Sequence, residues 1–513
     1  MKKDPENAFD VIVVGSGIGG LAAGSLLAAS GSSVLVLEQH DRPGGYAHGF
    51  RRKRYHFDSS VHLISGCEAD GFPGGQIIHK TLHAIGVRET IDFLPIDPVA
   101  VAIYPQLRAR IPRTKAAFLH EMAALFPEET QGLENLIDLS FNLAVTASNA
   151  QDIVNNDPDP MQSGLSSLQQ YRKSSLGDLC SQFVRDPGLI AILGANWPYL
   201  GLPPSRVSFL YWAMMFIGYL EDGACYCRGS FQRLADRLVD GLLEHGGKIR
   251  LRSAVRRICV ERNEVTGVEL RDGEVLKASN VIANSDMRQT VFDLVGNAHF
   301  PARFLNRLES LKPSLSIFVV YLATDLGPEG LGLGHESFYY SDMDHDRNYQ
   351  DSCQGRINWI GISIPTLSDP ALAPKGRHLA MLTTLLPYAV EGDWKKAKAG
   401  YIDAMLALAE KVWPGLNQHL LYVEGGSPNT LERYTWNYQG AAYGWDLRAD
   451  QTGARRIQNR SPIRGLYFAG HWATPGGGVC GAAVSGMQTA KSLLGIRTQS
   501  EFWERFRTQS AQR

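Results

Sequence analysis

The feature that most constrains this chain lies near its N-terminus, where a glycine-rich loop joins an apolar run to a helix. Residues Phe9 to Val14 (FDVIVV) are apolar and rich in β-branched side chains, which predicts a buried parallel strand. The next six residues, Gly15 to Gly20 (GSGIGG), fit the pattern G-x-G-x-x-G. A predicted helix over Leu21 to Ala28 and a predicted strand over Ser33 to Leu37 follow, and Glu38 comes next. This order predicts a βαβ unit that binds a dinucleotide.

Each part of this unit has a physical role in holding a dinucleotide. Gly15 allows the tight turn out of the strand, Gly17 lets backbone approach a pyrophosphate, and Gly20 lets the helix pack closely on the sheet. The helix N-terminus offers unpaired N–H groups to phosphates, and a carboxylate at Glu38 accepts hydrogen bonds from ribose hydroxyls. The expected cofactor contacts in this unit are Gly15, Ser16, Gly17, Ile18, Gly19, Gly20 and Glu38.

The segment after Glu38 carries a resemblance that specifies the dinucleotide. Residues 39–45 (QHDRPGG) place an R-x-G-G turn shortly after the acid, and residues 55–62 (YHFDSSVH) follow. This arrangement resembles the start of the amine oxidase and phytoene desaturase superfamily. The resemblance implies FAD as the cofactor, with Gln39, Gly44 and Gly45 as further contacts, and it implies that the segment ending at His62 leads toward the flavin ring.

A second block of the same superfamily is expected in the middle of the chain. Ser230 to Gly247 predicts a helix, Lys248 to Val260 predicts a strand, and a hairpin is predicted around Asp272-Gly273. A strand end rich in small residues follows at 280–286. The resemblance implies that Val255 contacts the adenine through its backbone; packing of Val255 in a strand core is compatible with that role.

The C-terminal region resembles the closing FAD motif of phytoene desaturases and carotenoid isomerases. A predicted strand over Leu466 to Ala469 leads to residues 470–482 (GHWATPGGGVCGA), and a helix is predicted over Ala482 to Leu493. The glycines repeat the G-x-G-x-x-G pattern, but the His-Trp and Thr-Pro pairs interrupt the junction and exclude a second nucleotide site. The resemblance implies flavin contacts at Gly470, His471, Gly478 and Val479. Many flavoproteins carry Asp at the position of His471.

These blocks predict an α/β fold with a discontinuous Rossmann-type FAD-binding domain and an inserted α+β substrate domain. The FAD-binding domain is expected over residues 1–95, 226–290 and 451–513, and the substrate domain over residues 96–225 and 291–450. Residues Val207 to Leu220 (VSFLYWAMMFIGYL) are uncharged and too short to span a bilayer. A core helix, the wall of a lipophilic tunnel and a helix at a membrane face are the three interpretations of this stretch.

Composition narrows the functional classes. Lys plus Arg number 51 and Asp plus Glu number 52, and this balance argues against a nucleic-acid binder. Seven scattered cysteines suit a reducing cytoplasm rather than a disulfide framework, and no zinc-ligand spacing or G-x-S-x-G motif occurs. We expect a cytoplasmic protein with a lipophilic small-molecule substrate and no metal, and contact with a membrane surface stays open.

The predicted function is an FAD-dependent oxidoreductase or isomerase that acts on the double bonds of a polyene or carotenoid-like substrate. The motifs leave desaturation and cis/trans isomerisation open, and a retinol-saturase-like reductase is the alternative enzyme. A non-enzymatic isoprenoid or lipid carrier on the same fold is the alternative of another class. His62, Tyr434 and His471 are the candidate acid/base or polarising residues. A packing role for His62, and a structural or flavin-contacting role for His471, are the competing interpretations.

Overall fold

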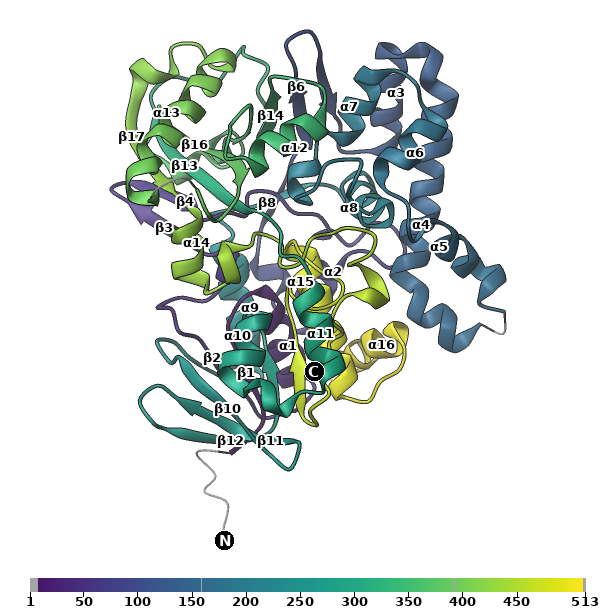
Figure 1. Ribbon diagram of the computed structural model, residues 1–513, viewed down its shortest axis with the longest axis vertical. Helices are drawn as coiled ribbons and strands as arrows, with labels where there is room; N and C mark the ends of the chain where they lie inside the picture. Colours follow the sequence, from purple (N-terminus) through teal and green to yellow (C-terminus); the bar gives the residue numbers. More distant parts are fainter. Residues whose placement is uncertain (1–7, 158, 391–392, 511–513) are drawn as a thin grey trace.

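A computed structural model describes residues 8–157, 159–390 and 393–510, and it contains two large sheets. Figure 1 shows the first sheet in the lower half and the second in the upper half, from the left to the centre of the view. The α/β fold class is confirmed, with a mixed, largely parallel sheet and a separate, largely antiparallel sheet. The sequence segments of the two sheets alternate along the chain, as an insertion requires.

The first sheet is built around the N-terminal strand. Its strand order is β10-β11-β12-β1-β2-β9, and β18 also pairs with β12. The strands are β1 (Ala8–Val14), β2 (Val34–Leu37), β9 (Lys248–Arg250), β10 (Val255–Glu261), β11 (Glu264–Leu270), β12 (Val275–Ala283) and β18 (Leu466–Phe468). Strand β1 pairs in parallel with β2 on one side and with β12 on the other. The chain therefore leaves β1 at a reversal of strand order, where ligands bind in open α/β sheets.

Three helices pack beside one another next to this sheet. Helix α1 (Ile18–Ala29) is buried along its whole length and packs against α9 (Gln232–Glu244) and α15 (Val479–Leu493). Such close packing depends on small residues at the contacts: a Cβ on Gly486 of α15 would overlap the carbonyl oxygen of Gly19. Helix α15 starts three residues earlier than the sequence predicts.

The strand predicted over Lys248 to Val260 is wrong as a single element, because it forms β9 and β10 separately. Residues 251–254 connect β9 to β10 and belong to neither strand. Arg252 has a left-handed φ of 55°, and its N–H donates to the carbonyl of His40, 3.0 Å away. The N–H of Ser253 donates to the carbonyl of Glu38 at 2.7 Å. The segment therefore crosses the end of β2 instead of continuing as a strand.

The second sheet separates an outer helix from an inner chamber. Its strand order is β17-β13-β16-β15-β14-β6-β7. The strands are β6 (Ala100–Ile103), β7 (Arg108–Ile111), β13 (Ser316–Thr324), β14 (Glu336–Tyr340), β15 (Trp359–Ser363), β16 (His378–Leu386) and β17 (Leu420–Gly426). Helix α13 (Trp394–Val412) packs on the outer face. Because side chains alternate along a strand, the inner face carries Val319, Glu336, Phe338 and Thr383.

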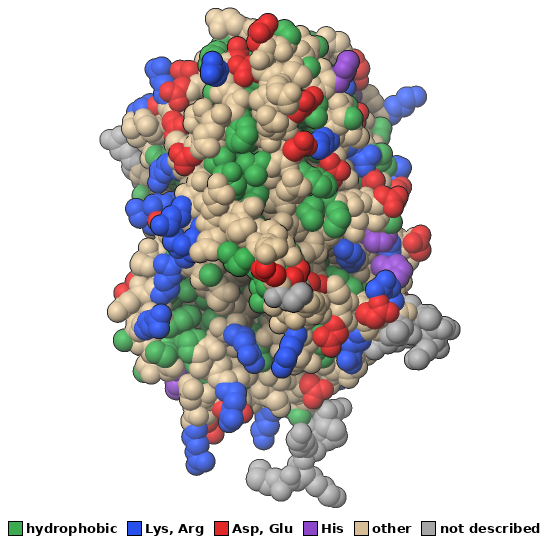
Figure 2. Space-filling view, turned by 90° about the vertical axis from the view of Figure 1, so that its right-hand side faces the viewer, with side chains coloured by type: hydrophobic (Ala, Val, Ile, Leu, Met, Phe, Trp, Pro, Cys, Tyr) green, Lys and Arg blue, Asp and Glu red, His purple; other side chains and the backbone are tan. Residues whose placement is uncertain are grey.

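The surface agrees with the near-neutral charge of the sequence. On the face in Figure 2, acidic and basic side chains lie interspersed, with apolar side chains between them. Within the described residues, no helix is both long enough and apolar enough to cross a membrane.

Candidate functional site

A single cavity of about 800 Å³ runs from the glycine-rich loop after β1 to the inner face of the second sheet. This volume lies near the upper end of the range for small-molecule sites. The cavity has a nucleotide end, lined by residues of the first sheet, and a chamber end, lined by α8 (Phe209–Glu221) and the second sheet.

The nucleotide end is shaped by glycines packed around one asparagine. Gly15 has a φ of +96°, and Gly17 is the N-terminal cap of α1. Asn284, which follows β12, donates from Nδ2 to the Gly15 carbonyl at 3.3 Å. A Cβ on Gly17 would lie 2.9 Å from Asn284 Nδ2, and one on Gly45 would lie 3.1 Å from the Gly17 Cα. A side chain at either position would overlap the loop or Asn284, so glycine keeps the loop compact at the helix N-terminus, where a dinucleotide pyrophosphate is expected.

The predicted ribose carboxylate also organises this loop. Glu38 Oε2 accepts from the backbone N–H and the hydroxyl of Ser16, at 2.8 and 2.6 Å, and Oε1 accepts from the His40 N–H at 2.8 Å. Glu38 lines the cavity, whereas Ser16 is fully buried behind it and Gly20 packs against the turn at Gly15. The other predicted contacts also line the cavity: Gly15, Gly17, Ile18, Gly19, Gln39, Gly44, Gly45, Val255, Gly470, His471, Gly478 and Val479.

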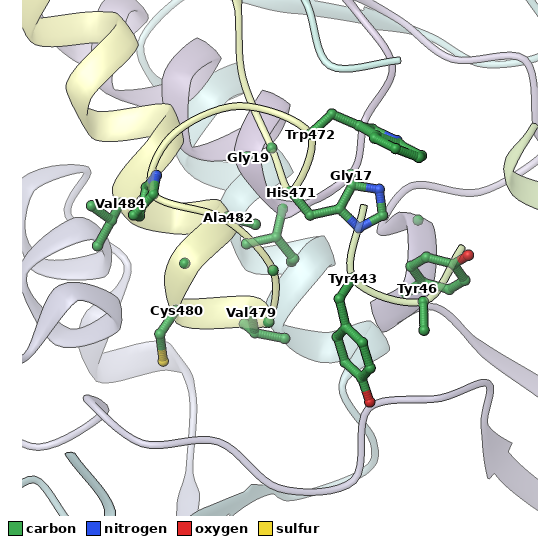
Figure 3. Close-up of a pocket in the computed structure, with 18 of the residues that line it drawn as sticks. Gly17, Gly19, Tyr46, Tyr443, His471, Trp472, Val479, Cys480, Ala482 and Val484 are labelled. Carbon is green, nitrogen blue, oxygen red and sulfur yellow. The ribbon is translucent and has the colours of Figure 1, made fainter. Parts of the chain in front are cut away.

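The C-terminal loop is held by a buried guanidinium. Arg456 donates to the carbonyl of Ala473 at 3.1 Å, to that of Trp445 at 3.3 Å, and also to those of Tyr443 and His471. These four bonds tie the loop before α15, at His471 and Ala473, to the segment at 443–445. Figure 3 shows Val479 and Cys480 at the start of α15 beside the pocket. Sequence reasoning missed Arg456 because its partners are backbone groups of a folded loop.

His471 faces the cavity as a neutral imidazole. Burial, with a smaller contribution from the nearby Arg456 charge, lowers its pKa to about 3. Its Nε2 lies 3.2 Å from Asn437 Oδ1, so the Nε2 proton is donated to that amide oxygen. The ring lies near Tyr46, with ring centres 5.9 Å apart (Figure 3). An imidazole that stays neutral and is fixed by hydrogen bonds favours a contact role over that of a base.

The chamber end is apolar and aromatic. Helix α8 turns Phe216 and Ile217 into the protein core, while Tyr211, Met214 and Tyr219 line the cavity. The core-helix and cavity-wall interpretations of residues 207–220 are therefore compatible, because one side of α8 packs in the core and another side lines the chamber. Across the chamber, the second sheet contributes Ile317, Val319, Phe338, Thr383 and Leu385.

His62 lies in the chamber wall beside a buried carboxyl that the sequence analysis missed. Its Nδ1 is 2.8 Å from the Ser60 carbonyl, and its Nε2 is 3.3 Å from Glu336 Oε2. The Ser363 hydroxyl lies 2.6 Å from the same Oε2. His335 donates from Nε2 to the His62 carbonyl at 2.9 Å. The only sequence sign of this site is a Glu at the start of an otherwise buried, aromatic strand.

Tyr434 lies apart from His62. It is 43% exposed at the rim of the nucleotide end, where its ring contacts those of His40 and His48. His40 belongs to the segment that follows Glu38, so Tyr434 lies near the predicted ribose position. The three candidate residues thus line one cavity at different places: His62 in the chamber, His471 at the C-terminal loop and Tyr434 at the rim.

The described residues contain no cluster of three or more His, Cys, Asp or Glu side chains arranged to hold a metal ion. A dinucleotide cradle that opens into an apolar chamber is typical of flavoprotein oxidoreductases.

The chain belongs to the family of flavin-containing amine oxidoreductases, whose family model matches residues 18–494. Membership confirms the resemblance at superfamily level and implies a flavin cofactor. The chain is 28% identical to the chloroplastic prolycopene isomerase of Daucus carota, over 96% of this chain and 81% of that protein. It is 26% identical to the all-trans-retinol 13,14-reductase of Macaca fascicularis, over 96% of this chain and 88% of that protein.

The fold also matches solved structures. An oxidoreductase from Methanosarcina mazei superposes with a TM-score of 0.63 at 20% identity, covering 94% of this chain and 99% of that one. At this identity the likeness concerns the fold.

Proposed function

We propose that this protein is an FAD-dependent oxidoreductase that acts on carbon–carbon double bonds of a long apolar polyene. The observation that carries the proposal is the continuity of the cavity, which joins the glycine cradle to an aromatic chamber. Aromatic and Met side chains suit an elongated apolar ligand because they offer large contact areas and adaptable shapes. The relatives named for prolycopene and retinol support the same substrate class.

The glycine cradle fits FAD. Gly15, Gly17 and Gly45 let the loop pack closely upon itself and around Asn284, and the N-terminus of α1 offers N–H groups where the pyrophosphate would lie. Glu38 would hold the adenosine ribose, and Gly478 and Val479 at the start of α15 would hold the flavin end. A bound flavin supplies hydride or electron exchange with a double bond. The residues of the chain orient the substrate against it and exclude water from the chamber.

The first test is the visible spectrum of the purified protein. A flavin spectrum, with FAD rather than FMN released on heating, supports the cofactor assignment. A colourless protein that does not take up added FAD would instead support the lipid carrier. Anaerobic incubation with a panel of polyenes, followed by chromatography, then separates new double bonds, lost double bonds and cis/trans changes.

We also propose that the substrate reaches the chamber from a lipid phase and that the protein works in the cytoplasm, at or near a membrane surface. Four fully buried free thiols support a reducing compartment: Cys67, Cys180, Cys225 and Cys227. Flotation with liposomes, with and without polyene, tests the membrane contact. Fractionation of cells that make the protein tests the compartment.

A further inference from the structure

We infer that the cavity has its own substrate entrance, between α4 (Thr130–Asn156), α5 (Ser166–Tyr171) and residues 449–455, and that this entrance holds the anionic end of a long apolar substrate. Arg172 and Arg455 would bind the anionic group, and the apolar chain would run inward to the chamber. This inference rests on the proposed function and narrows its substrate class, because a hydrocarbon polyene would leave both guanidiniums unused.

The cavity reaches solvent in two places. The lining residues whose side chains are exposed are Tyr434, at the rim of the nucleotide end, and Arg172 and Ala454, at the other opening. The adenosine end of FAD would fill the first opening, since Glu38 lines that end and the Tyr434 ring contacts that of His40. The second opening is then the route that stays free for a substrate.

Backbone hydrogen bonds fix the second opening around the start of α8. The N–H of Ser208 donates to the carbonyl of Leu447, and the N–H of Phe209 donates to the carbonyl of Ser174, both at 2.9 Å. The segment after Leu447 and the end of α5 therefore meet at the first turn of α8. Figure 1 shows α4 and α5 on the right-hand side of the molecule.

The passage from this opening to the chamber has an apolar wall. Small or aliphatic side chains from four helices line it: Ala147 and Ala150 of α4, Leu168 of α5, Leu210 and Met214 of α8, and Val484 of α15. Such a wall favours an apolar chain, because each Å² of apolar surface removed from water contributes about 25 cal/mol.

The outer end of the passage is polar and positively charged. Arg172 is exposed and Arg455 is half-buried, and Gln488 and Gln499 also line this end of the cavity. Gln499 begins α16 (Gln499–Ser510), and its N–H donates to Asp152 of α4 at 2.5 Å. Within the described part of the chain, neither guanidinium has a hydrogen-bond or ion-pair partner.

The acidic residues that line the cavity lie away from this opening. Glu38 and Asp286 belong to the nucleotide end. Asp222 follows α8 at its far end, where it accepts from the N–H groups of Phe72 and Gln76 at 3.1 and 3.3 Å. The guanidiniums at the opening are therefore available to an anion from outside. Their planar forks match the paired oxygens of a carboxylate or a phosphate.

The two ends of the passage set the orientation of the substrate. An anionic group drawn into the apolar chamber would lose its hydration at a large cost, whereas at the opening it keeps water and gains a guanidinium. The apolar end of the substrate would therefore enter first and lie toward the flavin end. The distance from the anionic group then determines which double bond reacts.

The end group is tested by binding to the flavin-loaded protein, measured by quenching of tryptophan fluorescence. The probes are polyenes of one chain length that end in methyl, hydroxyl, carboxylate or phosphate. We expect the carboxylate or the phosphate form to bind about 10-fold more tightly than the methyl form, the scale of one hydrogen bond to a charged group. The comparison of these two forms identifies which anion the opening prefers.

The double variant Arg172→Gln/Arg455→Gln should remove this preference and leave binding of the methyl and hydroxyl forms unchanged. Arg448→Gln is the matched control, because Arg448 lies in the same segment but is paired with Asp450 at 2.9 Å and does not line the cavity. Added salt should weaken binding of the anionic forms alone, since ions screen charges at an exposed opening.

The route is tested by narrowing the passage. Ala150→Trp places a large ring in the wall that α4 contributes, and we expect the association rate of every polyene to fall about 10-fold or more with flavin content unchanged. Asn142→Trp adds the same ring at an exposed position of α4 that does not line the cavity, and should leave the rate unchanged.

The outcomes separate the inference from the proposed function. Equal affinity of wild type for all four end groups, or an anion preference that survives in the double variant, would overturn the anionic end group. An unchanged association rate in flavin-loaded A150W would overturn the entrance. An anion preference without chemical change in any polyene would support the entrance and refute the proposed function.

Discussion

Protonation of the buried Glu336 carboxyl should contribute a pH dependence to the free energy of unfolding, and Glu336→Gln should remove that contribution. Glu336 lies on the inner face of β14, fully buried; its Oε2 accepts from the Ser363 hydroxyl at 2.6 Å, and His62 Nε2 lies 3.3 Å from the same oxygen. Its pKa is held well above its ordinary range in the folded protein by desolvation. In the unfolded chain the same side chain titrates near its ordinary value of about 4.3.

The sign and size of the effect follow from proton linkage. Between the unfolded and folded pKa values, the folded state keeps the proton and the unfolded state has lost it. Unfolding therefore releases one proton, and the free energy of unfolding falls by about 1.4 kcal/mol for each pH unit. The stabilisation is fully present below about pH 4 and is lost as pH rises toward the folded pKa. In Glu336→Gln this contribution is absent.

The assay is urea unfolding of wild type and E336Q, followed by tryptophan fluorescence at a fixed flavin concentration. We choose the range from about pH 6.5 to pH 8, because the folded His62, with a pKa of about 4, stays neutral there and its titration in the unfolded chain is common to wild type and E336Q. E336Q should gain stability relative to wild type as pH rises across this range, with a slope of at most about 1.4 kcal/mol per pH unit. Glu424→Gln, with its carboxylate ionised throughout, should run parallel to wild type. A constant difference between E336Q and wild type would refute the buried acid.

Three further predictions concern the cofactor end. Gly17→Val should abolish flavin absorbance, because its Cβ would lie 2.9 Å from Asn284 Nδ2 and would force apart the loop at the helix N-terminus, where the pyrophosphate is expected; full occupancy would place the phosphates elsewhere. His471→Asn should keep the shape of the pH–activity profile, since the imidazole is already neutral with a pKa of about 3; loss of an inflection near pH 6 would contradict this. Gly486→Ala should cost about 1–3 kcal/mol in urea unfolding by overlapping α1, whereas Gly400→Ala, in open space on α13, should not destabilise; equal effects would refute the packing argument.

The nucleotide end could be predicted because its determinants are local. The turn, the helix start and the carboxylate lie within residues 15–38, and the conformation of each is set by near neighbours in sequence. The interruption between β9 and β10 was not predictable in this way. Residues 251–254 (LRSA) contain no glycine or proline that would mark a break, and they leave the ladder because Arg252 and Ser253 hydrogen-bond to the backbone of residues 38–40.

The chamber could be predicted only in part. The apolar composition of 207–220 indicated a buried helix, but not which side faces a cavity. Glu336, Ser363 and His62 are brought together by pairing of β14 with β15 and by packing of the segment after β4 (Tyr55–Asp58) on that sheet. Sequence alone gives no register for these distant strands, so the partner of a lone buried Glu cannot be deduced from it.

The titratable groups around the chamber have one property in common, and it explains how a polar wall can serve an apolar substrate. Burial moves the pKa of each group toward its neutral form: downward for His62, His335 and His471, upward for Glu336 and the tyrosines. The guanidinium of Arg456 keeps its charge, with a pKa of about 10, but its donors are taken up by the backbone carbonyls of Tyr443, Trp445, His471 and Ala473. The groups around the chamber are therefore hydrogen-bonded dipoles rather than charges, and an apolar ligand would lie against them without having to displace a standing ion.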